Sequence, residues 1–343
     1  MALTDWRSLH GEHFEGRRVM VTGGAGFIGS HLCEALIELG AEVVVIDDLS
    51  GGDVANFASF SDTAGDRLLF IKGCILDRGL LEKAMSGCSY VFHQAALGSV
   101  PRSVEMPGRY VEVNINGTFN VLDAAREGGV RRLVLASSSS IYGDSPTLPK
   151  IESMPLRPKS PYAASKAADE MLLRAHADCY GIDTVSLRYF NIFGPRQNAN
   201  SAYAAVIAAF AKALGEGSAP VIFGDGEQSR DFTFVENAVH ANLLAARAEE
   251  SLGGEAMNIA CGDRITVNQL AAAMARRYGQ ADVQPIYQPP RAGDVRDSLA
   301  DLELAQTRIG YRPIIGFEQG LDATVSWYQE QSGQSTAGSP ARV

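Results

Sequence analysis

The chain has 343 residues, of which 46% are hydrophobic and 20% are charged. This apolar content suffices for a sizeable core in about two domains of ~150 residues each, and it excludes a disordered chain. The net charge of −10 argues against nucleic acid as a partner, because phosphate backbones require a basic surface.

The sequence suggests neither a membrane-spanning segment nor a signal peptide. No apolar run reaches the ~20 residues needed to cross a bilayer, and the first residues lack a basic segment followed by an apolar one. The cysteines are odd in number and have no CxxC spacing, which favours reduced thiols. They are Cys33, Cys74, Cys88, Cys179 and Cys261. We therefore expect a cytoplasmic protein without a membrane partner.

Short apolar runs alternate with amphipathic segments of helical length in the first part of the chain. We expect strands at residues 19–21, 43–46, 68–71, 90–92, 133–135 and 185–187. We expect helices between them, near residues 26–39, 78–86, 108–127 and 160–180. Continuous apolar runs indicate strands buried on both faces. The pattern predicts an α/β fold with a doubly wound parallel (Rossmann) sheet.

After about residue 190 the alternation loosens, with more Gly and Pro and with helical stretches near 201–215, 235–249 and 267–277. This indicates a smaller α/β domain, partly interleaved with the first, at the carboxyl edge of the sheet. The expected divisions are a mobile N-terminal extension (1–16), a dinucleotide-binding domain (17–189 plus about 232–262), a substrate domain (190–231 and 263–330) and a disordered tail (331–343).

The first expected strand leads directly into a glycine-rich turn with Gly23, Gly26 and Gly29. Such glycines allow a tight turn, close approach to a pyrophosphate and close helix–strand packing, and the following helix directs its N–H groups at the anion. The second strand ends in Asp47, which can bond a ribose 2′-hydroxyl and would repel a 2′-phosphate. The sequence predicts a dinucleotide site that prefers NAD to NADP.

A second group of residues suggests acid–base chemistry. Ser160 and Pro161 open a predicted helix on which Tyr162 and Lys166 share one face. A phenol has a pKa near ~10, and a neighbouring ammonium group lowers it. A run of serines, residues 137–140, ends the strand at 133–135, where a doubly wound sheet binds its ligand.

Together these segments resemble the extended short-chain dehydrogenase/reductase family, specifically its nucleotide-sugar 4-epimerases. The resemblance spans residues 17–325 and includes the motifs at 94–96, 114–118, 187–191 and 224–231. The segments 96–103 and 293–298 are most similar to the branch that interconverts UDP-N-acetylglucosamine and UDP-N-acetylgalactosamine. The resemblance implies C4 epimerisation of a UDP-hexose through a transient 4-keto sugar, with tightly bound NAD.

The resemblance also implies roles for individual residues. Tyr162 would be the acid/base, Lys166 its partner and a ligand of the nicotinamide ribose, and Ser138 the hydroxyl that bonds the sugar 4-oxygen. NAD would be held by Gly23, Gly26, Phe27, Ile28, Gly29, Asp47, Ala95 and Lys166. The UDP would be held by Asn191, Arg230, Arg291 and Asp294. The sugar pocket would be lined by Ser99, Ser139, Gln197, Ala205 and Ser298, besides Ser138 and Tyr162.

Two positions qualify the resemblance. The family usually has Gly-Asp-Ile after the third strand, where the aspartate meets the adenine amine, but this chain has Cys74 between Gly73 and Ile75. In the family, a bulky residue at the position of Ser298 excludes a 2-acetamido group. The small serine therefore predicts that N-acetylated sugars fit.

The sequence can also be compared with what other functions require. A nucleotide-sugar dehydratase or decarboxylase usually has a carboxylate where this chain has Ser139 and Ser140, and a non-catalytic NAD sensor would not need Tyr162 and Lys166. UDP-glucuronate 4-epimerase and UDP-glucose as the substrate are compatible with the sequence, and an alcohol dehydrogenase would differ by net production of NADH. No HExxH motif supports a metal. Family members are often homodimers, for which the segments 108–127 and 160–180 are candidates.

Overall fold

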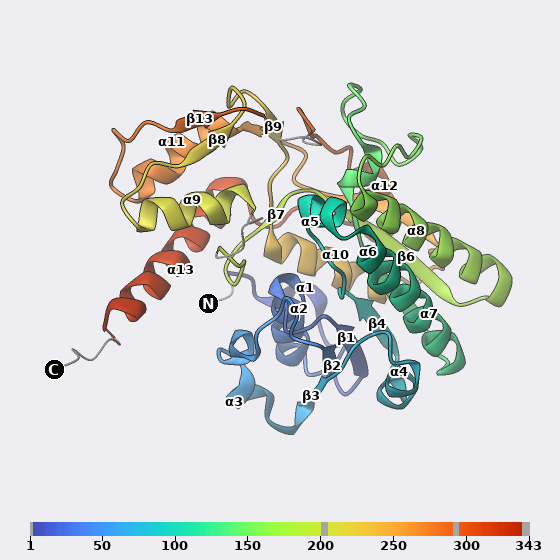
Figure 1. The fold of residues 1–343 in the computed structure, drawn as a ribbon. Helices are drawn as coiled ribbons and strands as arrows, with labels where there is room; N and C mark the ends of the chain where they lie inside the picture. The colour runs from blue at the N-terminus through green and yellow to red at the C-terminus, as the bar shows by residue number, and fades with distance from the viewer. Residues whose placement is uncertain (1–2, 200–204, 291–294, 338–343) are drawn as a thin grey trace.

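A seven-stranded parallel sheet lies at the centre of the computed structural model, which describes residues 3–199, 205–290 and 295–337 (Figure 1). Its strands are β1 (Arg18–Thr22), β2 (Glu42–Asp47), β3 (Leu68–Lys72), β4 (Tyr90–His93), β5 (Arg132–Ser138), β6 (Asp183–Tyr189) and β11 (Glu255–Ile259). The order in the sheet is β11-β6-β5-β4-β1-β2-β3, so the direction of winding reverses between β1 and β4. This confirms the predicted doubly wound α/β fold, and such a reversal point is where these sheets bind ligands.

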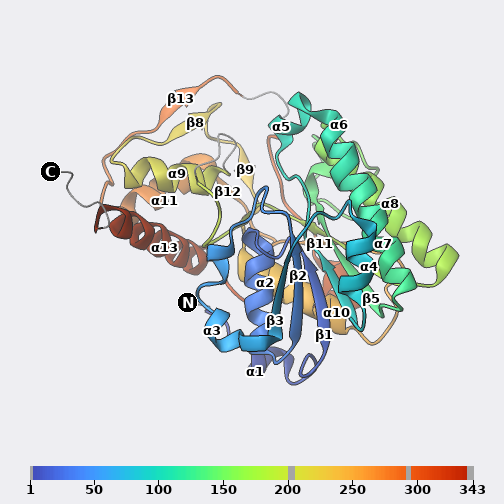
Figure 2. The same cartoon turned by 60° about the horizontal axis from the view of Figure 1, so that its bottom comes forward.

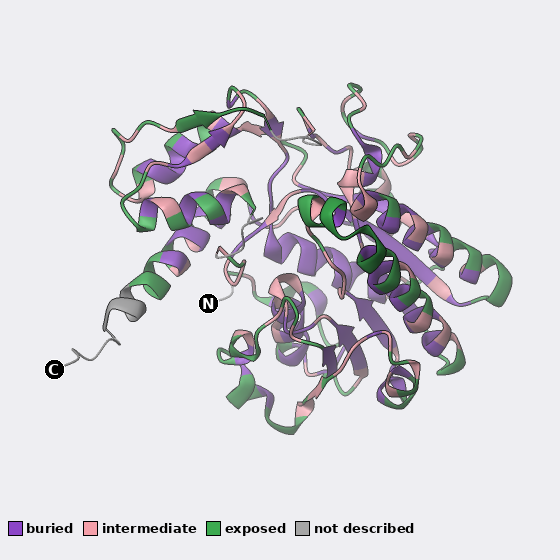
Figure 3. Ribbon diagram, in the orientation of Figure 1, coloured by how far each residue is buried: buried purple, intermediate pink, exposed green. Residues whose placement is uncertain are grey.

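Helices cover both faces of the sheet, which explains why its inner strands are buried along their length (Figures 2 and 3). Val19 and Val21 of β1 point to the face covered by α2 (Phe27–Glu38) and α10 (Val235–Arg247). Met20, between them, points to the opposite face. That face is covered by α4 (Arg78–Met85), α7 (Gly117–Glu127) and α8 (Pro161–Tyr180). Two apolar layers on one sheet require continuous apolar strands, as the sequence shows.

Short elements connect these layers. They are α1 (Trp6–His10), η1 (Val54–Phe57), α3 (Ser61–Ala64), η2 (Gly65–Arg67), α5 (Val100–Glu105), α6 (Pro107–Tyr110), the π-helical turn η3 (Val111–Asn116), η4 (Ser139–Tyr142) and α12 (Glu303–Ile309). Although α12 comes late in the chain, its Ala305 and Ile309 belong to the apolar core under the sheet. The end of the chain therefore passes back across the first lobe before α13.

A second lobe lies over the carboxyl edge of the sheet (Figure 1). It contains β7 (Ile192–Phe193), β8 (Val221–Phe223), β9 (Ser229–Arg230), β10 (Thr233–Phe234), β12 (Ile265–Thr266), β13 (Ile286–Gln288), α9 (Val206–Gly215), α11 (Val267–Arg277) and α13 (Phe317–Ala337). The strands form two-stranded pairs, and the helices enclose a separate apolar core that includes Phe193, Phe210 and Leu270.

The N-terminal residues differ from the mobile extension that the sequence suggests. Trp6 of α1 is 2% exposed and Phe14 is fully buried, both within the core under the sheet. His10 lies in a hydrogen bond with His240 of α10, with 3.0 Å between Nε2 and Nδ1. The segment is ordered because two large aromatic side chains lose their contact with water, which a search for periodic patterns does not detect.

The last described helix extends beyond the residue at which the sequence suggests disorder. The sequence suggests disorder from residue 331, whereas α13 continues to Ala337, and residues 338–343 lie outside the described part. Adding residues to an existing helix is easy even when they are small and polar. None of the described helices is both long and apolar enough to cross a membrane.

Candidate active site

The glycine-rich loop joins the end of β1 to α2 at the point where the winding of the sheet reverses. Gly23 has a φ of +70°, and a Cβ there would lie 2.7 Å from Cα of Ala95, in the loop after β4. A Cβ on Gly29 would lie 2.2 Å from the carbonyl oxygen of Gly23. Both positions therefore require glycine, the first for its backbone conformation and the second for the approach of α2 to the loop.

The N-terminus of α2 is suited to an anion. Gly26 is its N-cap residue, no described side chain caps the helix, and its first turn has no acidic residue. The first N–H groups of a helix have no partner within the helix, and the helix dipole favours negative charge at this end. The residues here, including Phe27 and Ile28, thus fit the pyrophosphate of a dinucleotide.

Asp47 lies beside this loop at the end of β2. Its Oδ2 accepts the backbone N–H of Ala25 at 3.0 Å and its Oδ1 accepts that of Leu49 at 2.8 Å. Burial raises the pKa of Asp47, and these two N–H groups oppose that rise. The carboxylate thereby connects the glycine loop to β2. Its predicted contact with a ribose hydroxyl remains a prediction.

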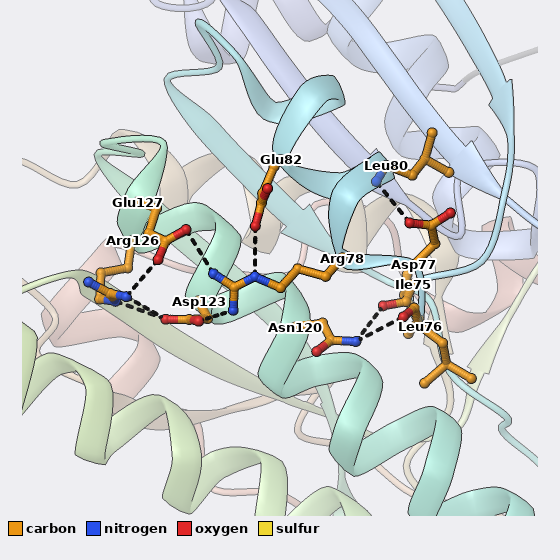
Figure 4. Close-up of polar contacts among 10 residues, drawn as sticks. All are labelled: Ile75, Leu76, Asp77, Arg78, Leu80, Glu82, Asn120, Asp123, Arg126 and Glu127. Atoms are coloured by element: carbon orange, nitrogen blue, oxygen red, sulfur yellow. Dashed lines mark hydrogen bonds and ion pairs between the residues drawn. The ribbon is translucent and has the colours of Figure 1, made fainter.

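The segment around Cys74, after β3, is held by helix α7 (Figure 4). Asn120 Nδ2 donates to the carbonyl oxygens of Ile75 and Leu76, at 3.3 and 3.2 Å. Asp77 is occupied as the N-cap of α4, since its Oδ1 accepts the N–H of Leu80 at 3.0 Å. Asp77 therefore has a structural role at the start of α4, three residues after Cys74, the position where the family usually has its aspartate.

Figure 4 also shows, to the left of this segment, an ion cluster that joins α4 to α7. Arg78 bonds Glu82 at 2.7 Å, Glu127 at 2.7 Å, and Asp123. Arg126 bonds Asp123 from the other side at 2.7 Å. The cluster lies at the surface, where ion pairs contribute little singly, and it supports the packing of the two helices as a network.

Helix α8 holds Tyr162 and Lys166 one turn apart. Ser160 is the N-cap, accepting the N–H of Ala163 at 3.1 Å, and Pro161 occupies the first turn, so the predicted helix start is confirmed. The Tyr162 ring is half-buried and meets the Tyr110 ring edge to face, with 6.4 Å between centroids. Lys166 is 2% exposed, and its Nζ lies 3.4 Å from Oδ2 of Asp169.

The run of serines ends β5, and α8 packs against both β5 and η4. Ser138 Oγ accepts the N–H of Ser140 at 3.2 Å, which leaves its own hydroxyl proton for another acceptor. Ser137 donates to Glu170 of α8 at 2.5 Å, and Glu170 also pairs with Arg188 of β6 at 2.8 Å. These buried bonds hold α8, and with it Tyr162, against the end of β5.

Two adjoining cavities open in the second lobe. The first, of about 270 Å³, is lined by residues that include Asn191, Ala205 and Arg230. The second, of about 440 Å³, shares Arg230 with the first and also contains Arg296. The Arg230 guanidinium donates from Nη1 to the carbonyl oxygens of Ser229 and Arg296, at 2.9 and 2.8 Å. The structure thus brings three of the predicted substrate residues to one cavity.

Asn191 and Ser298 are linked directly. Asn191, whose φ is +39°, donates from Nδ2 to Oγ of Ser298 at 3.0 Å and to the carbonyl oxygen of Asp231 at 2.9 Å. Ser298 is 8% exposed and also accepts the N–H of Asp231 at 3.3 Å. The predicted selectivity residue and a predicted UDP ligand therefore form one hydrogen-bonded unit.

The other predicted substrate residues that the structure describes are not among those that line the two cavities. Ser99 is the N-cap of α5, and its carbonyl oxygen accepts the Tyr110 hydroxyl at 2.7 Å. Ser139 lies in η4. Gln197 donates to the carbonyl oxygen of Ile192 at 3.1 Å and is not among the residues that line the first cavity. Arg291 and Asp294 lie outside the described residues.

Asp169, which the structure places beside Lys166, was not among the residues predicted from the sequence. A signal was present, because a carboxylate three residues after a lysine lies on the same helical face. Phe223 and Gln228, which line both cavities, were not predicted either. No local pattern distinguishes these two residues, because the folding of the second lobe brings them to the cavity.

Comparisons with known proteins agree on one family. The family model described as the NAD dependent epimerase/dehydratase family matches residues 19–260. A UDP-glucose 4-epimerase of Mycolicibacterium smegmatis is 38% identical over 319 residues, which cover 92% of this chain and 99% of the relative.

Solved structures extend this similarity to the fold. The UDP-N-acetylglucosamine 4-epimerase of Methanobrevibacter ruminantium, in complex with UDP-N-acetylmuramic acid, has 41% identity and a TM-score of 0.87 over 92% of this chain and 99% of its own. The UDP-glucose 4-epimerase of Thermus thermophilus, in complex with NAD, has 37% identity and a TM-score of 0.80 over 91% of this chain and 99% of its own.

Proposed function

The chain belongs to the NAD-dependent epimerase/dehydratase family, and on that basis we propose that it inverts carbon C4 of a UDP-hexose. The substrate pair is UDP-N-acetylglucosamine and UDP-N-acetylgalactosamine, with UDP-glucose and UDP-galactose as a second pair. One observation carries the proposal: α8, the helix that bears Tyr162 and Lys166, packs against β5, whose last residue is Ser138, and the segment from Ser137 to Tyr142 contains no carboxylate.

Tyr162 serves as the acid and base in this proposal. A phenol is a poor base at neutral pH, so it needs a cation nearby to favour the phenolate. Lys166 lies one turn further along the same helical face and is almost completely withdrawn from water. Low exposure strengthens its field at the phenol oxygen. Tyr162 takes the proton of the sugar 4-hydroxyl and later returns it.

Ser138 orients the sugar oxygen. Because its Oγ already accepts the N–H of Ser140, its hydroxyl proton points to another acceptor. A hydrogen bond to the 4-oxygen would place that oxygen within reach of Tyr162.

The glycine loop and the N-terminus of α2 hold the pyrophosphate of NAD, with Asp47 near the adenosine ribose and Ala95 and Lys166 near the other half. When bound, NAD supplies the reversible oxidation of C4 that makes inversion possible. The fit rests on the uncapped helix N-terminus and on two positions where a Cβ would not fit.

The second lobe holds the UDP and the sugar. Arg230, in both cavities, supplies positive charge to the diphosphate in a protein whose net charge is −10. Arg291 and Asp294 complete the nucleotide site in this proposal. Ser99, Ser139, Gln197, Ala205 and Ser298 belong to the sugar pocket.

The N-acetylated pair is favoured by the side chain of Ser298. It is small and is hydrogen-bonded to Asn191, which lines the first cavity, so a bulky residue at this position would reduce the space beside Asn191. Similarity to the UDP-N-acetylglucosamine 4-epimerase of M. ruminantium supports the same choice.

We also propose a homodimer formed through α7, α8 and the turn η3, which directly precedes α7. Their outer surface exposes large apolar side chains: Val111 is 50%, Phe119 44%, Met171 63% and Tyr180 60% exposed. Large apolar groups on adjoining helices mark a protein contact surface. A second copy of the chain would cover them.

The test is to incubate the purified protein separately with UDP-N-acetylglucosamine, UDP-glucose and UDP-glucuronate and to separate the products. We expect the 4-epimer of the acetamido sugar without net NADH. Conversion of UDP-glucuronate alone would assign the substrate to the hexuronate class instead. Loss of water or carbon dioxide, or accumulation of NADH, would contradict epimerisation.

The matched control is Tyr162→Phe, which keeps the ring and removes the hydroxyl. Loss of a positioned acid–base group typically slows a reaction about 10²–10⁴-fold. We expect a loss in this range with an unchanged unfolding temperature. Full activity in this variant would remove the central group of the proposal.

A further inference from the structure

A buried carboxylate lies next to the proposed catalytic lysine and has no role in the reaction described above. Asp169 is fully buried on α8, and its Oδ2 is 3.4 Å from Nζ of Lys166. Neither of its oxygens has a hydrogen bond of ordinary geometry to any described residue. A buried charge without hydrogen bonds is costly, so such a group calls for an explanation.

The groups that face Asp169 come from several elements. Glu170, its neighbour on α8, is already paired with Arg188 of β6. Thr118 of α7 lies beside the carboxylate and, with Lys166, favours its ionised form. His93 of β4 is hydrogen-bonded to the Thr118 hydroxyl at 2.9 Å through Nε2 and to Thr22 at 2.6 Å through Nδ1. Lys166 is therefore the cation that faces Asp169.

The direction of these bonds leaves a proton for the carboxylate. Thr22 Oγ1 accepts the N–H of Ala95 at 3.3 Å, so its own proton is free for Nδ1 of His93. Burial lowers the pKa of His93 to about 3, so the ring is neutral and carries its proton on Nε2. That N–H donates a hydrogen bond to Oγ1 of Thr118. The Thr118 hydroxyl can then donate its own proton to the carboxylate of Asp169.

Asp169 changes its charge in the pH range in which enzymes work. Burial raises the pKa of Asp169 to about 6, against the opposing effects of Lys166 and Thr118. Below that pH, Lys166 acts on its surroundings as an unpaired ammonium group. Above it, the ion pair cancels much of the lysine's field.

We propose that Asp169 is a positioning residue for Tyr162: by pairing with Lys166 it weakens the field of the ammonium group and so sets the pH at which the phenol gives up its proton. The inference rests on the proposed role of Tyr162 as the acid and base. Asp169 touches neither substrate nor cofactor in this scheme, and it acts through the lysine.

Helix geometry gives the size of the effect. Tyr162 and Asp169 are seven residues apart, which is about 10.5 Å along a helix axis. A unit charge at that distance, at an effective dielectric constant of about 20 to 40, shifts the phenol's ionisation by about 0.5 to 1 pH unit. Asp169→Asn keeps the shape and removes the charge, so the phenolate should form at lower pH.

The experiment compares Asp169→Asn with the natural protein in two ways. The acid limb of the pH profile of kcat should move down by about 0.5 to 1 pH unit, with little change in KM. The ultraviolet absorbance of the Tyr162 phenolate, taken as the difference from Tyr162→Phe in the NAD-loaded protein, should titrate at a pH lower by the same amount. The matched control is Asp178→Asn. Asp178 is on the same helix but is exposed and paired with Arg174 at 3.2 Å, so its replacement should change neither the pH profile of kcat nor the phenolate titration.

Two readouts separate the failure of this inference from the failure of the proposed function. The absorbance titration does not require turnover. If the Tyr162 phenolate forms at lower pH in Asp169→Asn but the natural protein shows no epimerase activity, the proposed function fails and this inference holds. An unshifted titration in Asp169→Asn would overturn it, whatever the activity. If Asp169→Asn unfolds, Asp169→Ala removes the same charge and makes the same prediction, with thermal unfolding as the check on folding.

Discussion

At the scale of single residues, Ser298 combines a small volume with a structural bond. Its Oγ accepts both the Asn191 side chain and the Asp231 backbone N–H, at 3.0 and 3.3 Å. Asp231 itself accepts backbone N–H groups from Cys261, Gly262 and Ala300, at 3.0, 3.1 and 3.2 Å. A residue expected to act by size alone is thus also part of a hydrogen-bonded network that includes Asn191, which lines the first cavity.

Replacing Ser298 by tyrosine tests its proposed effect on the substrate. Ser298→Tyr should fill the pocket and lower kcat/KM for UDP-N-acetylglucosamine by at least tenfold relative to UDP-glucose, because a 2-acetamido group no longer fits. Ser298→Ala is the control: it removes the hydroxyl without adding volume and should keep both substrates. If Ser298→Tyr keeps its kcat/KM for UDP-N-acetylglucosamine relative to UDP-glucose in the same assay, the proposed role of Ser298 in substrate selection is wrong.

At the scale of elements, α1 shows how a short helix is held by distant contacts. Asp5 caps it by accepting the N–H of Ser8 at 3.0 Å, and Trp6 and His10 are its buried residues. His10 stacks edge to face against His240 of α10, with ring centroids 5.0 Å apart. Burial, the larger cause, and the neighbouring His240 lower the pKa of His10 to about 3. Burial lowers the pKa of His240 to about 4.

These shifts predict that the histidine pair contributes to acid sensitivity. Between pH 6.5 and about 4, both rings are neutral in the folded protein and protonated in the unfolded chain. Because the unfolded chain binds more protons in this range, the free energy of unfolding decreases as the pH falls. Each histidine contributes about 1.4 kcal/mol per pH unit in that range. His10→Gln should therefore reduce the slope of unfolding free energy against pH by about that amount, as measured by denaturant titration.

Trp6→Phe serves as the comparison for His10→Gln. It weakens the packing of α1 and leaves both titrating rings in place, so it should lower stability by a similar amount at each pH. A slope unchanged by His10→Gln would show that this pair does not cause acid sensitivity.

At the scale of the whole molecule, the two lobes meet at the carboxyl edge of the sheet. Phe27 and Ile28, which open α2, pack against the core of the second lobe. Arg196, from the loop after β7, bonds Glu34 of α2 at 2.5 Å and Ser59 at 2.7 Å. The proposed nucleotide loop is thus in contact with both lobes, which suits an enzyme that keeps NAD bound.

The proposed dimer depends on the exposed apolar side chains of α7 and α8. A double replacement, Phe119→Glu with Met171→Glu, should convert the proposed dimer into a monomer, because two charges would enter an apolar interface. Ile286→Glu, at a residue 53% exposed on β13 of the other lobe, is the control and should leave the mass unchanged. Light scattering coupled to size-exclusion chromatography measures both, and a natural protein that elutes as a monomer would contradict the dimer.

Local signals in the sequence determined much of this protein. The apolar runs marked the strands β1 to β6, and the glycine spacing after β1 marked the loop at Gly23, Gly26 and Gly29. Ser160 and Pro161 marked the start of α8, and the family resemblance is confirmed by the match over residues 19–260. These features depend on backbone preference and on the periods of helix and strand, which act over a few residues.

Contacts between distant parts of the chain were decided by the tertiary structure. The bond from His10 to His240 joins residues 230 positions apart, and the bond from Asn191 to Ser298 spans 107. The pairing of Asp169 with Lys166 could be predicted from their spacing on one helix. The burial of Asp169 beside Thr118 could not, because Thr118 lies on a different helix. Whether a side chain is withdrawn from water, and beside which partner, depends on how the layers pack, and no short stretch of sequence contains that information.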